Sequence, residues 1–464
     1  MKGKFRAKNQ QIKRIHLMKV KVIGAGLAGC EAANKLASLG FEVDLYEMKP
    51  KKYSHAHKSE LFAELICSNS LKAFRYNSAA GLLKWEMEQL GSVCITAAKK
   101  CSVAAGGALA VDRELFSKAV TDSILNNPNI NVIHEEVKEI NPQEYTIIAT
   151  GPLTDGELAL SIKSLCGEEY LNFYDAAAPI VTADSIDYSK VFFESRYGKG
   201  SDDYINCPFN KEEYEAFYNA LLSAERAVMH DVDKPLQVYE GCMPIEVLAS
   251  RGKDAMRFGP LKPVGLKDPK TDRRPWAVVQ LRKENSQGSM LNLVGFQTNL
   301  KFGEQKRIFG MIPGLSNAEF VRYGVMHRNS FINSPKVLNK DFSLKNNNKI
   351  YFAGQISGVE GYMESAASGI LAALNLAAEL KLINKVDFPN TTMLGALSGY
   401  ISDDTVKNFQ PMGANFGVLP PLEVNIKDKQ KRYAELFYRS AQWYYNNGFA
   451  KEIPVVVLEE KGSK

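Results

Sequence analysis

This chain of 464 residues lacks paired cysteines and long apolar runs. Its seven cysteines are odd in number and scattered, with no Cys-x-x-Cys pair, so a disulfide framework is excluded. No uninterrupted apolar run reaches the roughly 20 residues of a transmembrane helix. No cluster of His, Cys and Asp has metal-ligand spacing, so we predict no metal site. These absences predict a cytoplasmic protein that does not enter a membrane.

A positive charge excess is also missing once the first 17 residues are set aside. The chain has 58 basic and 52 acidic residues, and residues 1–17 hold six of the basic ones and no acid. The rest of the chain is balanced, with 52 residues of each sign. We predict that 1–17 is a disordered basic extension. A polyanion that binds the remainder must find a local basic patch.

One such patch lies in residues 251–284. It holds ten Lys or Arg residues against four acids, and its prolines indicate loops. Two interpretations stay open on sequence alone. The stretch is either an ordinary solvated surface or a site for the phosphate groups of a nucleic acid.

What the chain does contain, near its start, is the strand–turn–helix–strand order of a dinucleotide site. An apolar strand predicted over 19–23 is followed by a helix over 30–39 and a strand over 42–46 that ends at Glu47. In the turn, Gly24 permits a tight bend, Gly26 lets the backbone approach a pyrophosphate, and Gly29 lets the helix pack closely on the strand. Glu47 is placed to accept a hydrogen bond from a ribose hydroxyl. The alternative is a Gly-rich turn in an ordinary α/β fold. The turn reads Gly24-Ala25-Gly26-Leu27-Ala28-Gly29.

Two later strand ends resemble the later FAD contacts of two-dinucleotide-type flavoproteins, and this resemblance favours FAD over a nicotinamide cofactor. A strand predicted over 145–149 leads into Thr150 and Gly151, and one over 349–353 leads into Gly354 and Gly361 before a helix over 365–380. Small residues at a strand end let a bulky cofactor approach, and a helix N-terminus stabilises negative charge on a reduced flavin. The sequence has no second Gly-x-Gly-x-x-Gly turn. We therefore predict resident FAD and an NAD(P)H donor that docks transiently.

The order of the predicted elements indicates a discontinuous domain. Interrupted helices are predicted over 60–91, a helix over 112–125, and a packed terminal helix over 429–449. Charged loops and aromatic residues dominate the middle, with strands over 277–281 and 291–296. We predict an α/β protein whose Rossmann-like FAD-binding domain is split by an inserted α+β domain. The predicted parts are 18–182 and 318–464 for the FAD-binding domain and 183–317 for the insert.

Longer motifs make almost the whole chain from Met18 onward similar to one family, the folate- and FAD-dependent tRNA (uracil-5-)-methyltransferases, TrmFO. The related MnmG family shares the nucleotide-binding elements. Beside the Gly-rich turn, the matching motifs are FAELICSNS at 62–70, GGALAVDR at 106–113, EGCMPIE at 240–246, YGVMHRN at 323–329 and GVEGYMESA at 358–366.

The resemblance implies transfer of a one-carbon unit from methylenetetrahydrofolate to C5 of a T-loop uridine in tRNA. Uracil C5 is a poor nucleophile until a thiolate adds to C6, and reduced FAD then supplies the hydride that completes the methyl group. Cys242 and Cys67 match the family's pair, with Cys242 as the C6 nucleophile and Cys67 as base or second thiol near the flavin. Without the resemblance, each would be read as a small buried hydrophobic residue.

Three alternatives stay open on sequence alone. The same chemistry could act on a uridine of 23S rRNA. The chain could instead be a flavin oxidoreductase for a small molecule, in which the basic patch is incidental. The last alternative is an RNA-binding flavoprotein without catalytic activity.

Overall fold

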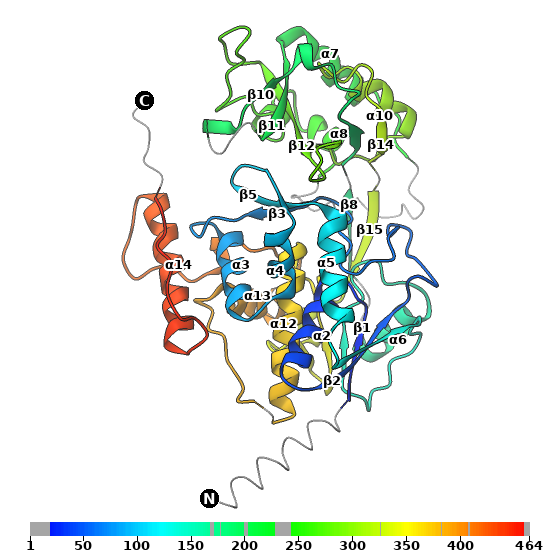
Figure 1. Ribbon diagram of the computed structural model, residues 1–464, viewed down its shortest axis with the longest axis vertical. Coiled ribbons are helices and arrows are strands. Elements are labelled where there is room, and N and C mark those ends of the chain that lie inside the picture. Colours follow the sequence, from blue (N-terminus) through cyan, green and yellow to red (C-terminus); the bar gives the residue numbers. More distant parts are fainter. Residues whose placement is uncertain are drawn as a thin grey trace, which may run out of the picture.

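The computed structural model describes residues 19–167, 171–176, 178–198, 203–227, 243–324, 326–381, 383–406 and 409–458. The predicted basic extension and Cys242 lie outside these ranges. Figure 1 shows a larger body that contains both the early and the late parts of the described chain, with a smaller body above it from the middle of the sequence. Within the described part, the helices are too short or too polar to cross a membrane.

A six-stranded sheet, in the order β16-β17-β7-β1-β2-β6, forms the centre of the larger body. All its pairings are parallel except that of β16 at the edge. Strand β1 lies between β2 and β7, so the strand order reverses beside it, which is where such sheets bind dinucleotides. This arrangement confirms the predicted Rossmann-like α/β fold. The strands are β1 (Lys19–Ile23), β2 (Glu42–Glu47), β6 (Ile130–His134), β7 (Thr146–Ile148), β16 (Ser343–Leu344) and β17 (Asn347–Phe352).

Two helices from opposite ends of the sequence cross at close range beside this sheet. Helix α2 (Leu27–Ser38) and helix α12 (Tyr362–Glu379) bury faces rich in Ala and Gly. A Cβ atom placed on Gly369 of α12 would lie 2.1 Å from the carbonyl oxygen of Ala28 in α2. The two backbones therefore touch, and this crossing ties the late part of the chain to the first Gly-rich turn.

Buried Glu86 of α3 (Ala79–Gln89) joins this helix to α13 (Met393–Ser402) and α14 (Lys429–Asn446). Its carboxylate accepts hydrogen bonds from the N–H groups of Met393 and Leu394, each at 2.8 Å, and from the Ser440 hydroxyl at 2.7 Å. The terminal helix α14 packs here, which confirms the predicted terminal helix. The remaining helices of the larger body are α3 (Ala79–Gln89), α4 (Val93–Lys100), α5 (Arg113–Leu125), α6 (Gly156–Cys166), α11 (Ser334–Val337), α13 (Met393–Ser402) and α14 (Lys429–Asn446). Its small sheet has the order β3-β5-β4, with β3 (Ser70–Ala73), β4 (Ser102–Val103) and β5 (Ala108–Val111).

The smaller body is an antiparallel sheet covered by short helices, with a hydrophobic core of its own. Its strand order is β10-β11-β12-β13-β9-β14. Its strands are β9 (Ile180–Thr182), β10 (Phe192–Phe193), β11 (Tyr204–Phe209), β12 (Ala277–Lys283), β13 (Met290–Leu293) and β14 (Phe320–Arg322), and its helices are α7 (Lys211–Leu222), α8 (Ile245–Ser250), α9 (Ala255–Phe258) and α10 (Phe302–Phe309). We call this body the insert.

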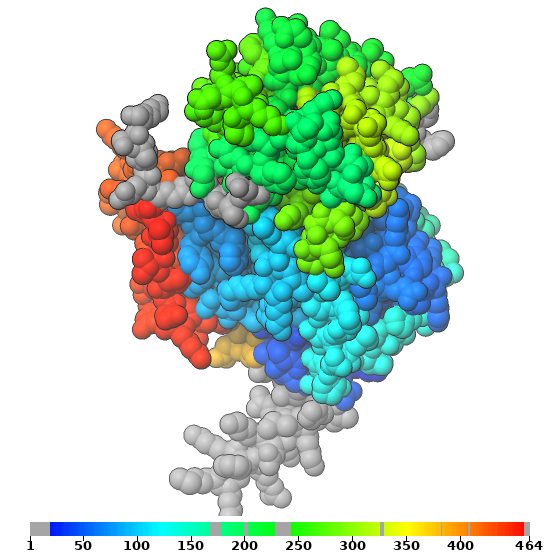
Figure 2. Space-filling view, turned by 45° about the horizontal axis from the view of Figure 1, so that its top comes forward, coloured from blue at the N-terminus to red at the C-terminus, as the bar shows by residue number. Residues whose placement is uncertain are grey.

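Two paired strands connect the insert to the larger body. Strand β8 (Leu171–Ala176) runs antiparallel to β15 (Met326–Phe331) between the two bodies. In the space-filling view the insert, in green, lies directly on the blue and cyan surface of the larger body (Figure 2). Strands β9 and β14 pair within the insert sheet although they fall outside 183–317. We therefore propose wider insert boundaries, at about residues 178 and 324.

The helix predicted from Glu60 up to an interruption at Ser68-Asn69-Ser70 is wrong, because no helix or strand forms there before β3. Ala63 has a φ of 51°, which ends any helical path. The N–H of Phe62 donates to the Thr121 hydroxyl at 2.8 Å, and the N–H of Ala63 donates to the carbonyl of Ala25 at 3.0 Å. Distant residues thus satisfy the backbone groups that a helix would pair locally.

The close helix crossing predicts that Gly369→Ala destabilises the fold. The added methyl group would meet the Ala28 carbonyl and force α2 away from α12, so we expect a loss of about 2–3 kcal/mol in the free energy of unfolding. Gly399→Ala in α13 is the matched control, because nothing lies within 4 Å of the added Cβ. That change is expected to be neutral or stabilising. Urea unfolding of both variants tests this, and equal stability would contradict it.

Candidate active site

A cleft opens at the carboxyl ends of β1, β2, β7 and β17. It gathers most of the cofactor residues predicted from the sequence, which come from segments far apart in the chain. Gly29 and Gly361 lie outside its lining. The predicted residues that line it are Gly24, Ala25, Gly26, Leu27, Ala28, Glu47, Thr150, Gly151 and Gly354.

The three glycines of the first turn have different surroundings. Gly24 has a φ of 97°, and a Cβ on it would lie 2.7 Å from the Ala149 carbonyl oxygen. A Cβ on Gly29 would lie 1.7 Å from the carbonyl oxygen of Gly24, so this position packs the helix against the turn. Gly26 lines the cleft and has nothing within 4 Å of its Cβ position. The open backbone at Gly26 therefore fits the approach of a pyrophosphate.

Two helix N-termini lie at the cleft without a side-chain cap. Gly26 is the N-cap of α2 and Gly361, with a φ of 115°, is the N-cap of α12, and neither accepts a capping hydrogen bond. Tyr362 and Ser365 of the first turn of α12 line the cleft. Uncapped N–H groups and the positive end of the helix dipole favour anionic groups. Helix α12 begins three residues earlier than the sequence predicts, which brings its N-terminus to the cleft.

Glu47 lies at the end of β2 with its carboxylate held by backbone. One oxygen accepts from the N–H of Ala25 at 2.8 Å, and the other accepts from the N–H of Lys49 at 3.0 Å. The side chain is only 7% exposed yet still lines the cleft. Each carboxylate oxygen accepts more than one hydrogen bond, so Glu47 fits a ribose hydroxyl as well as the turn that it braces.

His57 is a lining residue to which the sequence assigns no cofactor role. Its Nδ1 lies 2.6 Å from the Ser54 hydroxyl. Burial and the charge of Lys49 lower the pKa of His57 to about 4, so the ring is neutral near pH 7. A neutral ring leaves the cleft without an extra cation there. The polar loop around His57 has no sequence pattern that predicts a place in the cleft lining.

Cys67 lies on the wall of the same cleft, at the end of the irregular segment 60–69. Its N–H donates to the Tyr362 hydroxyl at 2.7 Å, and the N–H of Ser68 donates to the same oxygen at 3.2 Å. Burial and the nearby Cys67 raise the pKa of Tyr362, so its hydroxyl stays protonated. The first residue of α12 therefore fixes the thiol-bearing backbone beside the cofactor cleft.

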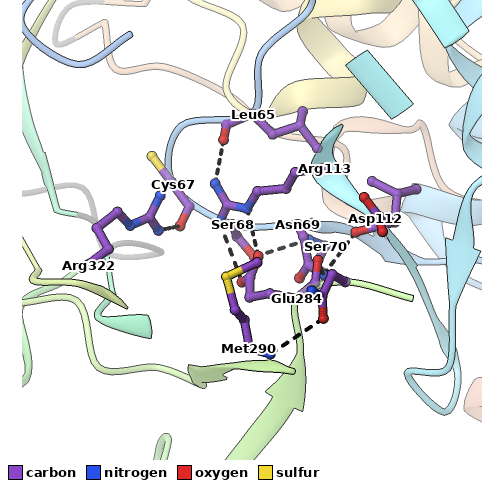
Figure 3. A network of polar contacts seen from close by, with 12 residues as sticks. Leu65, Cys67, Ser68, Asn69, Ser70, Asp112, Arg113, Glu284, Met290 and Arg322 are labelled. Atoms are coloured by element: carbon purple, nitrogen blue, oxygen red, sulfur yellow. Dashed lines mark hydrogen bonds and ion pairs between the residues drawn. The ribbon is translucent and has the colours of Figure 1, made fainter. Parts of the chain in front are cut away.

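Asn69 connects the loop 65–70, which we call the thiol loop, to the insert (Figure 3). Its carboxamide is fully buried, donates to the carbonyls of Val111 and Lys283, each at 3.0 Å, and accepts from Arg282 Nη2 at 2.7 Å. Arg282 also donates to the Ser68 hydroxyl at 3.0 Å. Buried hydrogen bonds thus join the end of β12 to the thiol loop.

Two further guanidinium groups hold the other side of the thiol loop. Arg113 Nε donates to the Glu284 carboxylate at 2.6 Å, and its Nη1 donates to the carbonyls of Leu65 and Ile66. Arg322 of β14 donates to the Ile66 carbonyl at 3.0 Å and to the Cys67 carbonyl at 3.4 Å. Burial lowers the pKa of Arg322 to about 10, so the group remains charged near pH 7.

The basic stretch 251–284 is not one continuous phosphate-binding surface. Arg282 is 6% exposed and belongs to the thiol-loop network. Arg257 lies 3.9 Å from the ring centroid of Trp276 and pairs with Asp254. Lys253 pairs with Glu215, and Lys267 pairs with Asp272, each at 2.6 Å. In the folded protein, several of these basic side chains therefore pair with other groups of the same chain.

Fold and cleft together define a dinucleotide-binding α/β protein with a thiol at its cofactor site. A sequence model of the family described as Glucose inhibited division protein A matches residues 19–384. The chain is 58% identical over 421 residues to methylenetetrahydrofolate--tRNA-(uracil-5-)-methyltransferase TrmFO of Acetivibrio thermocellus, which covers 91% of this chain and 96% of that one. It is 54% identical over 427 residues to the TrmFO of Halalkalibacterium halodurans, which covers 92% and 98%. The chain belongs to the GidA family and, within it, to the TrmFO group.

The fold agrees with solved structures of the same family. Two crystal forms of Aquifex aeolicus GidA match with TM-scores of 0.65 and 0.66 at 16% sequence identity. Each match covers 94% of this chain and 74% or 76% of the other. At this identity the likeness shows a shared fold.

The lowered pKa of His57 predicts a pH dependence of stability. Between pH 6.5 and pH 4 the unfolded chain takes up a proton on His57 that the folded chain does not, so acid lowers the free energy of unfolding. His57→Gln removes this contribution. The stability of the wild type relative to the variant should fall by about 2 kcal/mol from pH 7 to pH 5. Urea unfolding at both pH values measures it, and parallel pH profiles would contradict the assignment.

The buried carboxamide predicts that Asn69→Ala is strongly destabilising. The change removes the acceptor of a buried guanidinium and leaves two carbonyls without their donor, so we expect a loss of about 2–4 kcal/mol. Asn131→Ala is the control, because Asn131 is exposed and bonds only to Asp44 among the described residues. That variant should stay within about 0.5 kcal/mol of the wild type. Chemical denaturation that gives both variants the same loss would refute a special role for Asn69.

Proposed function

We propose that this chain transfers a one-carbon unit from methylenetetrahydrofolate to C5 of a T-loop uridine in tRNA and completes it to a methyl group, with FAD as resident cofactor. The observation that carries the proposal is that Cys67 lines the same cleft as the Gly-rich turn. Relatives between 54% and 58% identical over about nine-tenths of the chain bear the name of this reaction. The cytoplasm is the compartment in which such a substrate is found.

The cleft residues fit FAD part by part. The open backbone at Gly26 and the N-terminus of α2 fit the pyrophosphate, and Glu47 fits a ribose hydroxyl. Gly354 and the uncapped N-terminus of α12 fit the flavin ring. Bound FAD supplies, when reduced, the two electrons that turn a methylene-level carbon into a methyl group.

The thiols supply the reactivity that uracil lacks. A thiolate that adds to C6 forms a C–S bond and places negative charge on C5, which then attacks the folate methylene. Loss of the C5 proton to a base expels tetrahydrofolate by cleavage of its C–N bond and leaves a methylene group at C5. A hydride, which reduced FAD would supply, adds to this methylene, and the C–S bond then breaks to release the methylated uridine and the thiolate. We assign the addition to Cys242, outside the described residues. We assign the proton transfer to Cys67. The Arg322 guanidinium donates to its carbonyl and to that of Ile66, and Arg113 also donates to the Ile66 carbonyl.

NAD(P)H is the reductant that we propose for the resident cofactor. The sequence contains one Gly-x-Gly-x-x-Gly turn, and this turn lines the cleft that we assign to the resident dinucleotide. The donor is therefore expected to bind only transiently.

Labelled methylenetetrahydrofolate tests the proposal with FAD, NADPH and an unmodified tRNA transcript. We expect label at C5 of a tRNA uridine from the wild type, and losses of at least about 100-fold in Cys242→Ala and in Cys67→Ala. Cys101→Ala is the control, because this cysteine is also partly exposed but does not line the cleft. It should retain the wild-type rate.

The same assay includes a 23S rRNA fragment as second substrate. Label that enters only the rRNA fragment would keep the chemistry and move the target. A yellow protein that NADPH reduces but that labels neither RNA would contradict the methyltransferase proposal and favour a small-molecule oxidoreductase.

A further inference from the structure

A second cavity lies on the other side of the thiol-bearing segment from the cofactor cleft. Glu64 and Ile66 line both cavities, so one short stretch of backbone separates them. The second cavity is built by both bodies, with Arg113 from α5 on one side and Phe302 of α10 and Tyr323 after β14 on the other. We call it the outer cavity.

Two rings of a three-ring aromatic stack, Phe302 and Tyr323, line the outer cavity. Tyr323 is the middle ring, 4.7 Å from Phe302 and 4.9 Å from Phe320 between ring centroids, with interplanar angles of 18° and 7°. Phe302 ends the stack and is 55% exposed, and its neighbour in the lining, Val321, is 52% exposed. A half-exposed ring held flat by two rings behind it is a preformed surface for another planar group.

The rest of the lining of the outer cavity is largely polar and carries both signs of charge. Lys58 is exposed there, and Arg113 and Arg322 also line it. Two carboxylates, Glu64 and Glu114, share the lining. Such a mixed wall has no strong preference for an anion. The aromatic stack is therefore the feature that selects a ligand.

We propose that Phe302 is the platform on which an unpaired nucleobase next to the reacting uridine of the RNA substrate stacks. The inference rests on the proposed function, because it assigns the outer cavity to the same RNA. A uridine that reaches the thiol loop must leave its base stack, which exposes the face of the adjoining base. An aromatic side chain restores that stacking for any base, since every base has a π-face.

The position of the outer cavity favours a base over the folate pterin ring. The methylene carbon must meet the uridine at the cofactor cleft, whereas Phe302 lies across the 64–66 segment from it. The lining charges do not discriminate between the two ligands, because Lys58, Arg113 and Arg322 share the cavity with two carboxylates.

RNA binding by Phe302→Ala tests the platform directly. Filter binding of a tRNA transcript and a 23S rRNA fragment, in a Cys67→Ala background that blocks turnover, should show about 10- to 100-fold weaker binding of the substrate RNA in Phe302→Ala. Phe302→Trp should bind within about threefold of the parent protein, and RNA should quench the fluorescence of its introduced indole. Phe258→Ala is the matched control, since Phe258 is an insert phenylalanine that is 83% exposed and lies outside the outer cavity.

Three results would overturn the inference. One is unchanged RNA affinity in Phe302→Ala, and another is an equal loss in Phe258→Ala. The third is parent protein that binds neither RNA. If the first result came with a rise in the folate KM of the otherwise wild-type Phe302→Ala enzyme, it would assign the outer cavity to folate instead. Binding is measured without methyl transfer, so a protein that binds RNA through Phe302 but labels none would contradict the proposed function alone.

Discussion

The buried polar contacts around Asn69 are the constraint on which the thiol site depends. Cys67 lies in neither a helix nor a strand, and the backbone of its segment bonds instead to groups from both bodies. Arg282 and Arg322 come from the insert, whereas Arg113 and Tyr362 come from the larger body. A thiol fixed in this way keeps its position only while the two bodies stay docked. In the proposed function, the insert is therefore part of the active site as well as a separate folded unit.

Small residues impose the second constraint. Gly24 and Gly29 bring the first turn, the sheet and α2 together without side chains between them, and Gly369 brings α12 against the backbone of α2. The close crossing places the N-terminus of α12 at the cleft, where Tyr362 meets the thiol loop. The cofactor cleft and the thiol position thus share one set of contacts. A change that separates α2 from α12 should disturb both.

The local parts of this architecture could be predicted from sequence, because hydrophobic period and glycine spacing report them. The first strand, turn, helix and second strand, the acid Glu47 and the split of the larger body follow from such patterns. Residues 60–69 could not, since their N–H groups bond to Ala25 and Thr121, which no local pattern encodes. The contacts of Arg282, Glu284 and Arg322 were equally hidden, because their respective partners Asn69, Arg113 and Ile66 lie far away in the chain. The basic stretch was ambiguous for the same reason, as folding turns Arg282 inward and leaves Arg273 and Arg274 exposed.

Covalent capture of the RNA tests the central claim that a thiol of this protein adds to uracil C6. An RNA substrate with 5-fluorouridine at the target position traps the adduct with its C–S bond intact. A base cannot remove the C5 fluorine as it removes the C5 proton, so the reaction stops before the C–S bond breaks. Peptide mapping by mass spectrometry then locates the adduct. The account predicts an adduct on the peptide that contains Cys242, formed also in Asn131→Ala but not in Cys242→Ala. An adduct on another cysteine would contradict the assigned roles, and the absence of any adduct with a bound RNA would contradict thiol addition itself.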